Sequence, residues 1–181
     1  AHKWLCVYFK EFSLSTLYSQ NSGIASYKIL LPEYNKTEKN EGSNLMQQAK
    51  LVAENQIYIL EFNDKQSHFF KNKNMENDIE ENKLVNGLAS IIIGNENYYD
   101  RHQNISINEN VNGILLKDND PKKNWVISTE SKLIDNYKCY KAEYIESYKN
   151  SNGAIKTRSI IAWFSPSLPY PYGPRGYNGL P

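Results

Sequence analysis

The sequence predicts a mainly β protein with a minor α component: a curved antiparallel sheet or half-barrel with one or two helices packed on it. Three observations lead to this fold class. Segments that alternate apolar and polar residues recur along the chain, separated by turns rich in Asn, Asp and Gly. Tyr, which is favoured in strands, occurs 14 times in 181 residues. Two long alternating segments near the C-terminus flank a turn that is typical of a β-hairpin.

The first 21 residues resemble a degraded signal peptide or leader. Lys3 precedes an apolar run and small polar residues follow it, as in an export signal, although Lys10 and Glu11 interrupt the run. An amphipathic first element of the folded domain is the alternative interpretation. We therefore expect a leader over residues 1–21 and a single β-rich domain over residues 22–181. No later stretch approaches the ~20 apolar residues that a membrane helix requires.

Two helices are expected in the first half of the domain. Ser43 is suited to cap a helix that continues to about Glu54, because apolar residues between them recur at helical spacing. Residues 83–93 form a second possible helix that Gly94 would end, although three consecutive isoleucines in it favour a strand. The strands predicted in this half cover residues 23–31, 56–62 and 67–70.

The second half of the domain is typical of strands throughout. Residues 118–121, with two Asp, an Asn and a Pro, predict a strong break. The clearest element is a hairpin, in which residues 137–148 and 154–164 are long strands joined by a turn that ends in Gly153. Shorter strands are expected at residues 98–99, 105–107, 113–116 and 125–128. The sequence thus predicts at least six strands.

Residues 165–181, rich in Pro, Gly and Tyr, are expected to form an extended surface strap. Proline lacks the backbone donor that a strand in the middle of a sheet needs, so this segment cannot be a central strand. Its Tyr rings are expected to pack flat against the prolines. Two roles are open for the strap: it covers a sheet edge that would otherwise aggregate, or it recognises a peptide or glycan.

Short motifs in the last 60 residues or so resemble those of a known family in their order and spacing. They are Trp125-Val126-Ile127, Lys132-Leu133-Ile134, Tyr137–Ala142, Ala162-Trp163-Phe164, Leu168-Pro169, Gly173-Pro174 and Gly179-Leu180-Pro181. Together they resemble the GLPGLI family of bacterial envelope proteins. With weaker matches earlier in the chain, the resemblance covers roughly residues 22–181. The domain is expected to be incomplete at its C-terminus, because the chain stops partway through the motif that names the family.

The resemblance implies a β-rich protein with a signal peptide that is secreted or lies in the envelope of a Gram-negative bacterium, in the periplasm or at the outer membrane. The family has no established activity, so no catalytic residue is carried over. The matching motif residues have a role that is either structural or in binding. They are Cys139, Ala142, Trp163, Pro169, Gly173, Pro174, Gly179, Leu180 and Pro181.

The sequence contains none of the motifs of metalloproteases, serine hydrolases or P-loop enzymes. We therefore expect no catalytic centre, no cofactor and no metal site, since the histidines at positions 2, 68 and 102 are scattered. A reactive Cys139 would need a nearby base, whereas a buried structural thiol would not. A disulfide to Cys6 is conceivable if the leader is retained. The net charge of +1, without a basic patch, argues against nucleic acid as a partner.

The favoured function is a non-enzymatic binding or structural module of the cell envelope, with a protein, peptide or glycan as partner. Two alternatives are open. A hydrolase would use Cys139 or a histidine as its reactive group, and would place His68 or His102 in a cleft within about 4 Å of Cys139 or of a carboxylate. A carrier would hold an apolar ligand in a dry concavity of the sheet.

Overall fold

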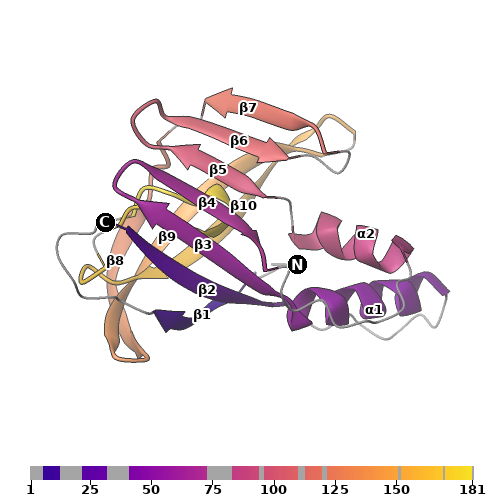
Figure 1. Ribbon diagram of the computed structural model, residues 1–181, viewed down its shortest axis with the longest axis horizontal. Coiled ribbons are helices and arrows are strands. Elements are labelled where there is room, and N and C mark those ends of the chain that lie inside the picture. Colours follow the sequence, from indigo (N-terminus) through magenta and orange to yellow (C-terminus); the bar gives the residue numbers. More distant parts are fainter. Residues whose placement is uncertain are drawn as a thin grey trace. The chain divides into compact units, whose positions relative to one another are not determined.

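The computed structural model describes residues 6–12, 22–31, 41–72, 83–93, 96–109, 113–119, 122–150, 152–168 and 170–180 (Figure 1). These residues form two helices and strands β1 to β10, so the predicted fold class, mainly β with a minor α component, is confirmed. The strands belong to two antiparallel sheets, neither of which is closed into a barrel. The chain divides into two compact units, one of residues 1–4, 121–173 and 177–181 and the other of residues 5–120 and 174–176.

Sheet A, in the second of these units, contains seven antiparallel strands that follow one another in chain order. Its strands are β1 (Cys6–Phe12), β2 (Ser22–Leu30), β3 (Ile57–Asn63), β4 (Gln66–Lys71), β5 (Asn97–Asp100), β6 (Ile105–Glu109) and β7 (Leu115–Asn119). The strand β1 lies within the segment that the sequence predicts as a leader, and it pairs with β2, with Val7 opposite Ile29. The rest of that segment lies outside the described residues.

One face of sheet A is the core of its unit. Because side chains alternate across a strand, Tyr58, Leu60 and Phe62 of β3 share this face with Ile29 of β2 and Phe69 of β4. All five are buried. The Tyr58 ring stacks on the Phe69 ring, with centroids 5.7 Å apart, and burial raises the pKa of the Tyr58 hydroxyl above its ordinary value.

The same face carries a buried polar cluster at its β5–β6 end. Asn97 is only 5% exposed. Its Nδ2 donates hydrogen bonds to Ser106 Oγ at 2.8 Å and to Asn108 Oδ1 at 2.7 Å. Residues Pro174–Gly176, a 3-10 turn labelled η2, pack against β4 and β5 in this unit, and Gly176 lies beside the Asn97 amide. A buried amide is stabilised only when its donors are satisfied, as they are here.

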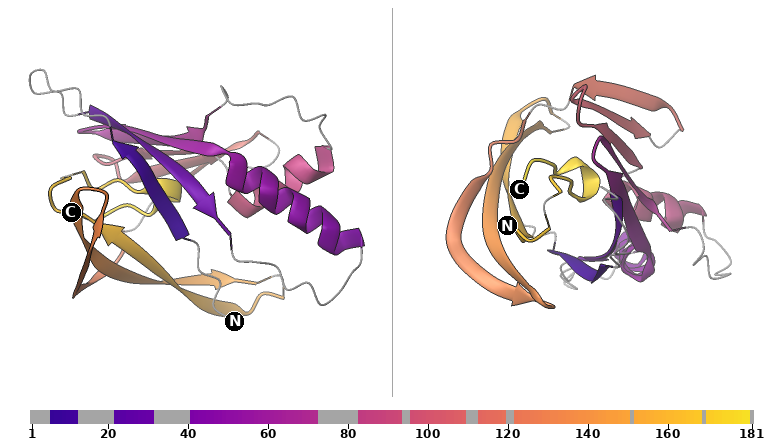
Figure 2. Two further views of the ribbon diagram at one scale, coloured as in Figure 1. Left: turned by 90° about the horizontal axis from the view of Figure 1, so that it is seen from below. Right: turned by 60° about the vertical axis from the view of Figure 1, so that its left-hand side comes forward.

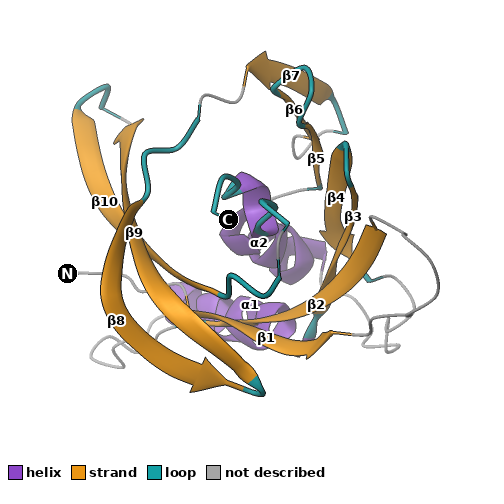
Figure 3. Ribbon diagram, turned by 90° about the vertical axis from the view of Figure 1, so that its left-hand side faces the viewer, coloured by secondary structure: helices purple, strands orange, loops and turns teal. Residues whose placement is uncertain are grey.

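The two helices lie side by side beyond one end of the strands of sheet A (Figures 1 and 3). The helix α2 spans Lys83–Ile93, as predicted, and α1 spans Glu41–Asn55. The prediction that Ser43 caps α1 is wrong, because the helix already includes Glu41. The buried side chains of the pair are small or branched: Ala49 and Ala53 of α1, and Val85 and Ala89 of α2. No helix in the described part of the chain is long and apolar enough to cross a membrane.

Sheet B contains the predicted hairpin. Its strands β8 (Val126–Ile134), β9 (Tyr137–Lys149) and β10 (Ile155–Phe164) lie in the order β10-β9-β8 and are strongly curved (Figure 2). The turn between β9 and β10 is stabilised by Asn150, whose Oδ1 accepts a hydrogen bond from Ala154 N at 2.8 Å. Gly153 has a φ of 76°, a conformation that glycine adopts without strain and that this turn requires.

The strands β7 and β8 end well beyond their predicted ranges. The strand predicted at 113–116 is β7, which begins only at Leu115 because Gly113 bends the chain with a φ of 76°. Asp118 and Asn119, predicted as part of a break, lie in β7, because an edge strand tolerates polar side chains on both faces. The strand predicted at 125–128 continues to Ile134 as β8. Its polar middle, between Ile127 and Ser131, forms a bulge.

The strap contains no strand among its described residues, in agreement with its prolines. Most of its described residues are half-buried, and Asn178 is buried. Within the first unit, Asn178 accepts two hydrogen bonds that hold the strap in place. Its Oδ1 accepts from Gly173 N at 3.1 Å, and its backbone O accepts from Trp125 Nε1 at 2.9 Å. These bonds fix the strap against the start of β8.

Candidate functional site

The face of sheet A opposite the core is exposed and carries a continuous row of large side chains. Register places one residue from each of six neighbouring strands directly beside the next. The row is Ile24, Glu61, His68, Tyr98, Ile107 and Lys117. Ile24 is 48% exposed and Tyr98 is 41% exposed. We call this surface the exposed face of sheet A.

His68 is held in the middle of this row by its neighbours. Its ring stacks between Phe70, with centroids 4.4 Å apart, and Tyr98, with centroids 3.8 Å apart. Its Nε2 lies 3.2 Å from Glu96 Oε2. The hydrolase hypothesis requires such an approach of His68 to a carboxylate. Here, however, aromatic rings cover both sides of the imidazole, and Glu96 contacts one of its nitrogens. We therefore assign His68 a role in stabilising the exposed face of sheet A.

Glu96 and Glu109 form a pair of like charges on the exposed face of sheet A. The two residues are cross-strand neighbours, because Glu109 N donates to Glu96 O at 3.2 Å. Both carboxylates act on the Tyr98 hydroxyl, whose pKa is raised first by burial and then by Glu96 and Glu109. Like charges on directly opposite residues destabilise a sheet. Glu96 has His68 as a partner, and Glu109 has no cation as a partner in the described part of the chain.

Replacing Glu109 by Gln should therefore stabilise the protein. Removal of one of the two charges relieves the cross-strand repulsion and breaks no ion pair, so we expect the free energy of unfolding to rise by about 0.2–1 kcal/mol at low salt. Urea unfolding at pH 7 measures this change. Glu96→Gln is the matched control: it relieves the same repulsion but loses the contact with His68, so it should gain less. A loss of stability in Glu109→Gln would contradict the assignment.

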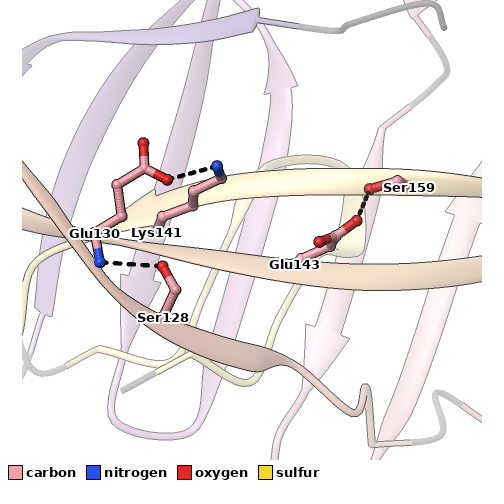
Figure 4. A network of polar contacts seen from close by, with 5 residues as sticks. All are labelled: Ser128, Glu130, Lys141, Glu143 and Ser159. Carbon is pink, nitrogen blue, oxygen red and sulfur yellow. Dashed lines mark hydrogen bonds and ion pairs between the residues drawn. The ribbon is translucent and has the colours of Figure 1, made fainter.

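Sheet B carries a polar network on an exposed face (Figure 4). Lys141 Nζ lies 2.6 Å from Glu130 Oε2, and the Ser159 hydroxyl donates to the Glu143 carboxylate. At the bulge of β8, Ser128 Oγ accepts from Glu130 N at 3.2 Å and so orients Glu130 toward Lys141. Exposed ion pairs of this kind contribute about 0.2–1 kcal/mol. We assign the network to the solubility and register of sheet B.

Cys139 is a buried, free thiol, 5% exposed. Its Sγ donates to Tyr137 O at 3.6 Å. Burial raises the pKa of the thiol above its ordinary value, and the nearby Lys132 ammonium opposes this only in part. The thiol is therefore protonated at neutral pH, which favours the structural interpretation of Cys139 over that of a nucleophile.

In a Cys6→Ser background, Cys139 should react slowly with a thiol reagent in the native state. Because the thiol is buried and its pKa is raised, we expect labelling about tenfold or more slower than in urea. The rate should increase with pH well above neutrality, since only the thiolate reacts. Stopped-flow absorbance with a disulfide reagent measures both rates. Equal rates in native and unfolded protein would show an accessible thiolate and support the hydrolase alternative.

The other residues predicted from the family motif lie in sheet B or in the strap. Ala142 is completely buried in β9. Trp163 of β10 is half-buried, and Lys132 Nζ lies 4.1 Å from its ring centroid. Gly173 and Gly179 help to form the strap, where Gly179 has a φ of 98° and lies beside Trp125. Pro174 begins η2, Leu180 is half-buried, and Pro169 and Pro181 lie outside the described residues. The described members of this set are not gathered into one site.

Sequence reasoning missed the group formed by His68, Tyr98, Glu96 and Glu109. The two members of the ion pair lie 28 positions apart, so no local motif joins them. A usable signal was present: Tyr98 and Glu96 are two positions apart at the start of β5, and alternation places residues with this spacing on one face of a sheet. His102, the other candidate, is exposed in the turn after β5, and His2 lies outside the described residues. Among the residues that the structure describes, no three His, Cys, Asp or Glu side chains form a group that could hold a metal ion.

The chain matches no family model, no curated protein and no solved structure.

Proposed function

We propose that this protein is an exported, non-enzymatic binding module of the bacterial cell envelope, a member of the GLPGLI family, and that it binds a partner on the exposed face of sheet A. The single observation that supports binding is the row of side chains across six strands of this sheet, in which the apolar Ile24 and the aromatic Tyr98 are exposed. The envelope location and the family rest on the motif resemblance of residues 125–181.

The physical reason lies in the cost of an open apolar face. Ile24 and Tyr98 remain about half exposed although the opposite face of the same sheet provides the core. Contiguous exposed apolar surface with a polar border is characteristic of interaction sites, and Tyr supplies large contact area with a polar tip. The protonated, buried thiol of Cys139 supports a role without catalysis.

Site-specific photo-cross-linking tests the proposal. A benzophenone amino acid placed at position 98 should give a discrete cross-linked product in the cells that make the protein, and an excess of unmodified protein should compete for it. The control position is Ser147, which is exposed on sheet B. The same set of products from both positions, or no product from position 98, would refute the proposal.

A further inference from the structure

The exposed face of sheet A is acidic as well as apolar. Register and alternation place the carboxylates of Glu61, Glu96, Asp100 and Glu109 on it, and the lysines Lys28 and Lys117. The two lysines are on β2 and β7, at opposite sides of the face, whereas the carboxylates belong to the segments between them. The chain as a whole has a net charge of +1, so this negative character is local to the face.

Two of the carboxylates on this face lie close enough to repel each other. Glu96 and Glu109 repel each other across two strands, and Leu115, 63% exposed, lies directly opposite Glu109 on the other side. The His68 imidazole is already engaged by Glu96 and stacked between two rings. A sequence that keeps a destabilising arrangement within an otherwise regular sheet typically does so for function. A cation placed between the two carboxylates would turn their repulsion into attraction.

We propose that the exposed face of sheet A binds a segment of a partner protein that presents a Lys or Arg side chain between apolar side chains. The cation lies between Glu96 and Glu109, and the apolar side chains pack on Tyr98, Ile107 and Leu115. Apolar contact supplies most of the affinity, and the carboxylates supply specificity for a positive partner. The inference rests on the proposed function and adds the chemistry of the partner.

Two synthetic peptides of 14 residues test the charge preference on the intact protein. One is an amphipathic peptide of Leu and Lys, the other has Glu in place of Lys, and both are acetylated and amidated. The Lys peptide should bind, measured by fluorescence anisotropy, and its affinity should fall as salt is raised, since exposed charges are screened. The Glu peptide should bind at least about tenfold more weakly.

The decisive variant is Glu109→Gln. It should bind the Lys peptide about fivefold more weakly than the wild type, because one of the two carboxylates is lost. Its folded state is expected to be more stable than the wild type, so weaker binding cannot be attributed to unfolding. Glu143→Gln, the same change on sheet B, should bind like the wild type.

Three results would overturn the inference: no binding of the Lys peptide, equal binding of both peptides, or the same loss of affinity in Glu109→Gln and Glu143→Gln. The last would show attraction to charge anywhere on the molecule. A cross-linked product from position 98 together with any of these results would leave the binding module in place and remove only its preference for a cation.

Discussion

Replacing Asn97 by Asp should lower the free energy of unfolding by about 3 kcal/mol at pH 7. The Asn97 amide is buried, and its Nδ2 donates to Ser106 Oγ and Asn108 Oδ1. An aspartate has the same shape but no donor, so a carboxylate oxygen would face the Asn108 oxygen without a hydrogen between them. Urea unfolding followed by circular dichroism measures the loss.

The deficit of Asn97→Asp should depend on pH. Burial disfavours the charged form, so the pKa of the new carboxyl in the folded state should exceed its unfolded value of about 3.9. Below about pH 3.9 the carboxyl is protonated in both the folded and the unfolded protein. Its O–H can then donate to Asn108, so the loss of stability shrinks. The loss grows as the pH rises above about 4, because the unfolded protein then ionises first. Asn108→Asp is the control, because a carboxylate at position 108 still accepts from Asn97. An equal or larger loss in that control would contradict the assigned direction of the bond.

Replacing Gly173 by Ala should also lower the free energy of unfolding by roughly 3 kcal/mol. A Cβ at position 173 would lie 2.2 Å from the backbone O of Tyr177, and a backbone atom cannot rotate away as the end of a side chain can. The strap would have to shift, which also strains the hydrogen bond from Gly173 N to Asn178.

Two measurements on Gly173→Ala separate a local from a general effect. Urea unfolding gives the loss of stability, and hydrogen exchange of the Trp125 indole N–H, which donates to Asn178 O, reports on the strap directly. Gly153→Ala is the control in the same unit: its φ of 76° is unfavourable for Ala, unlike that of Gly173, but nothing lies within 4 Å of the new Cβ. It should cost about 1–2 kcal/mol and leave the exchange unchanged. Unchanged stability in Gly173→Ala would show that the strap is not held as described.

Local signals predicted much of the fold. The hairpin of β9 and β10 was predicted because alternation and a Gly-containing turn act over a few residues, and Gly153 does adopt the required positive φ. The strand β2 and the helix α2 were predicted for similar reasons. For the hairpin and β2, backbone preference and side-chain periodicity favour the same structure. In α2, helical periodicity prevails over the strand preference of its three consecutive isoleucines.

The features that were not predicted share a different cause, since they depend on neighbours that are distant in sequence. Asp118 and Asn119 form a strand because β6 pairs with them, although their own propensities favour a turn. Asn97 was not recognised as a core residue, because only its bonds to Ser106 and Asn108 make an amide acceptable there. The residues that form the exposed face of sheet A were not predicted for the same reason: the exposure of Tyr98 follows from the sheet, not from residues 97–100.

The order of the strands in the two sheets determines how the chain can fold. In sheet A, as in sheet B, each strand pairs with the strand before it in the chain, so β-pairing requires no closure of a loop that spans other strands. The longest interval between paired strands is the one that α1 occupies, between β2 and β3. Such local connectivity lowers the entropic cost of the first contacts and favours fast refolding for a protein with this much β structure. Refolding should thus spread from hairpin to hairpin along the chain, and the two long intervals that contain α1 and α2 should be the slowest steps within sheet A.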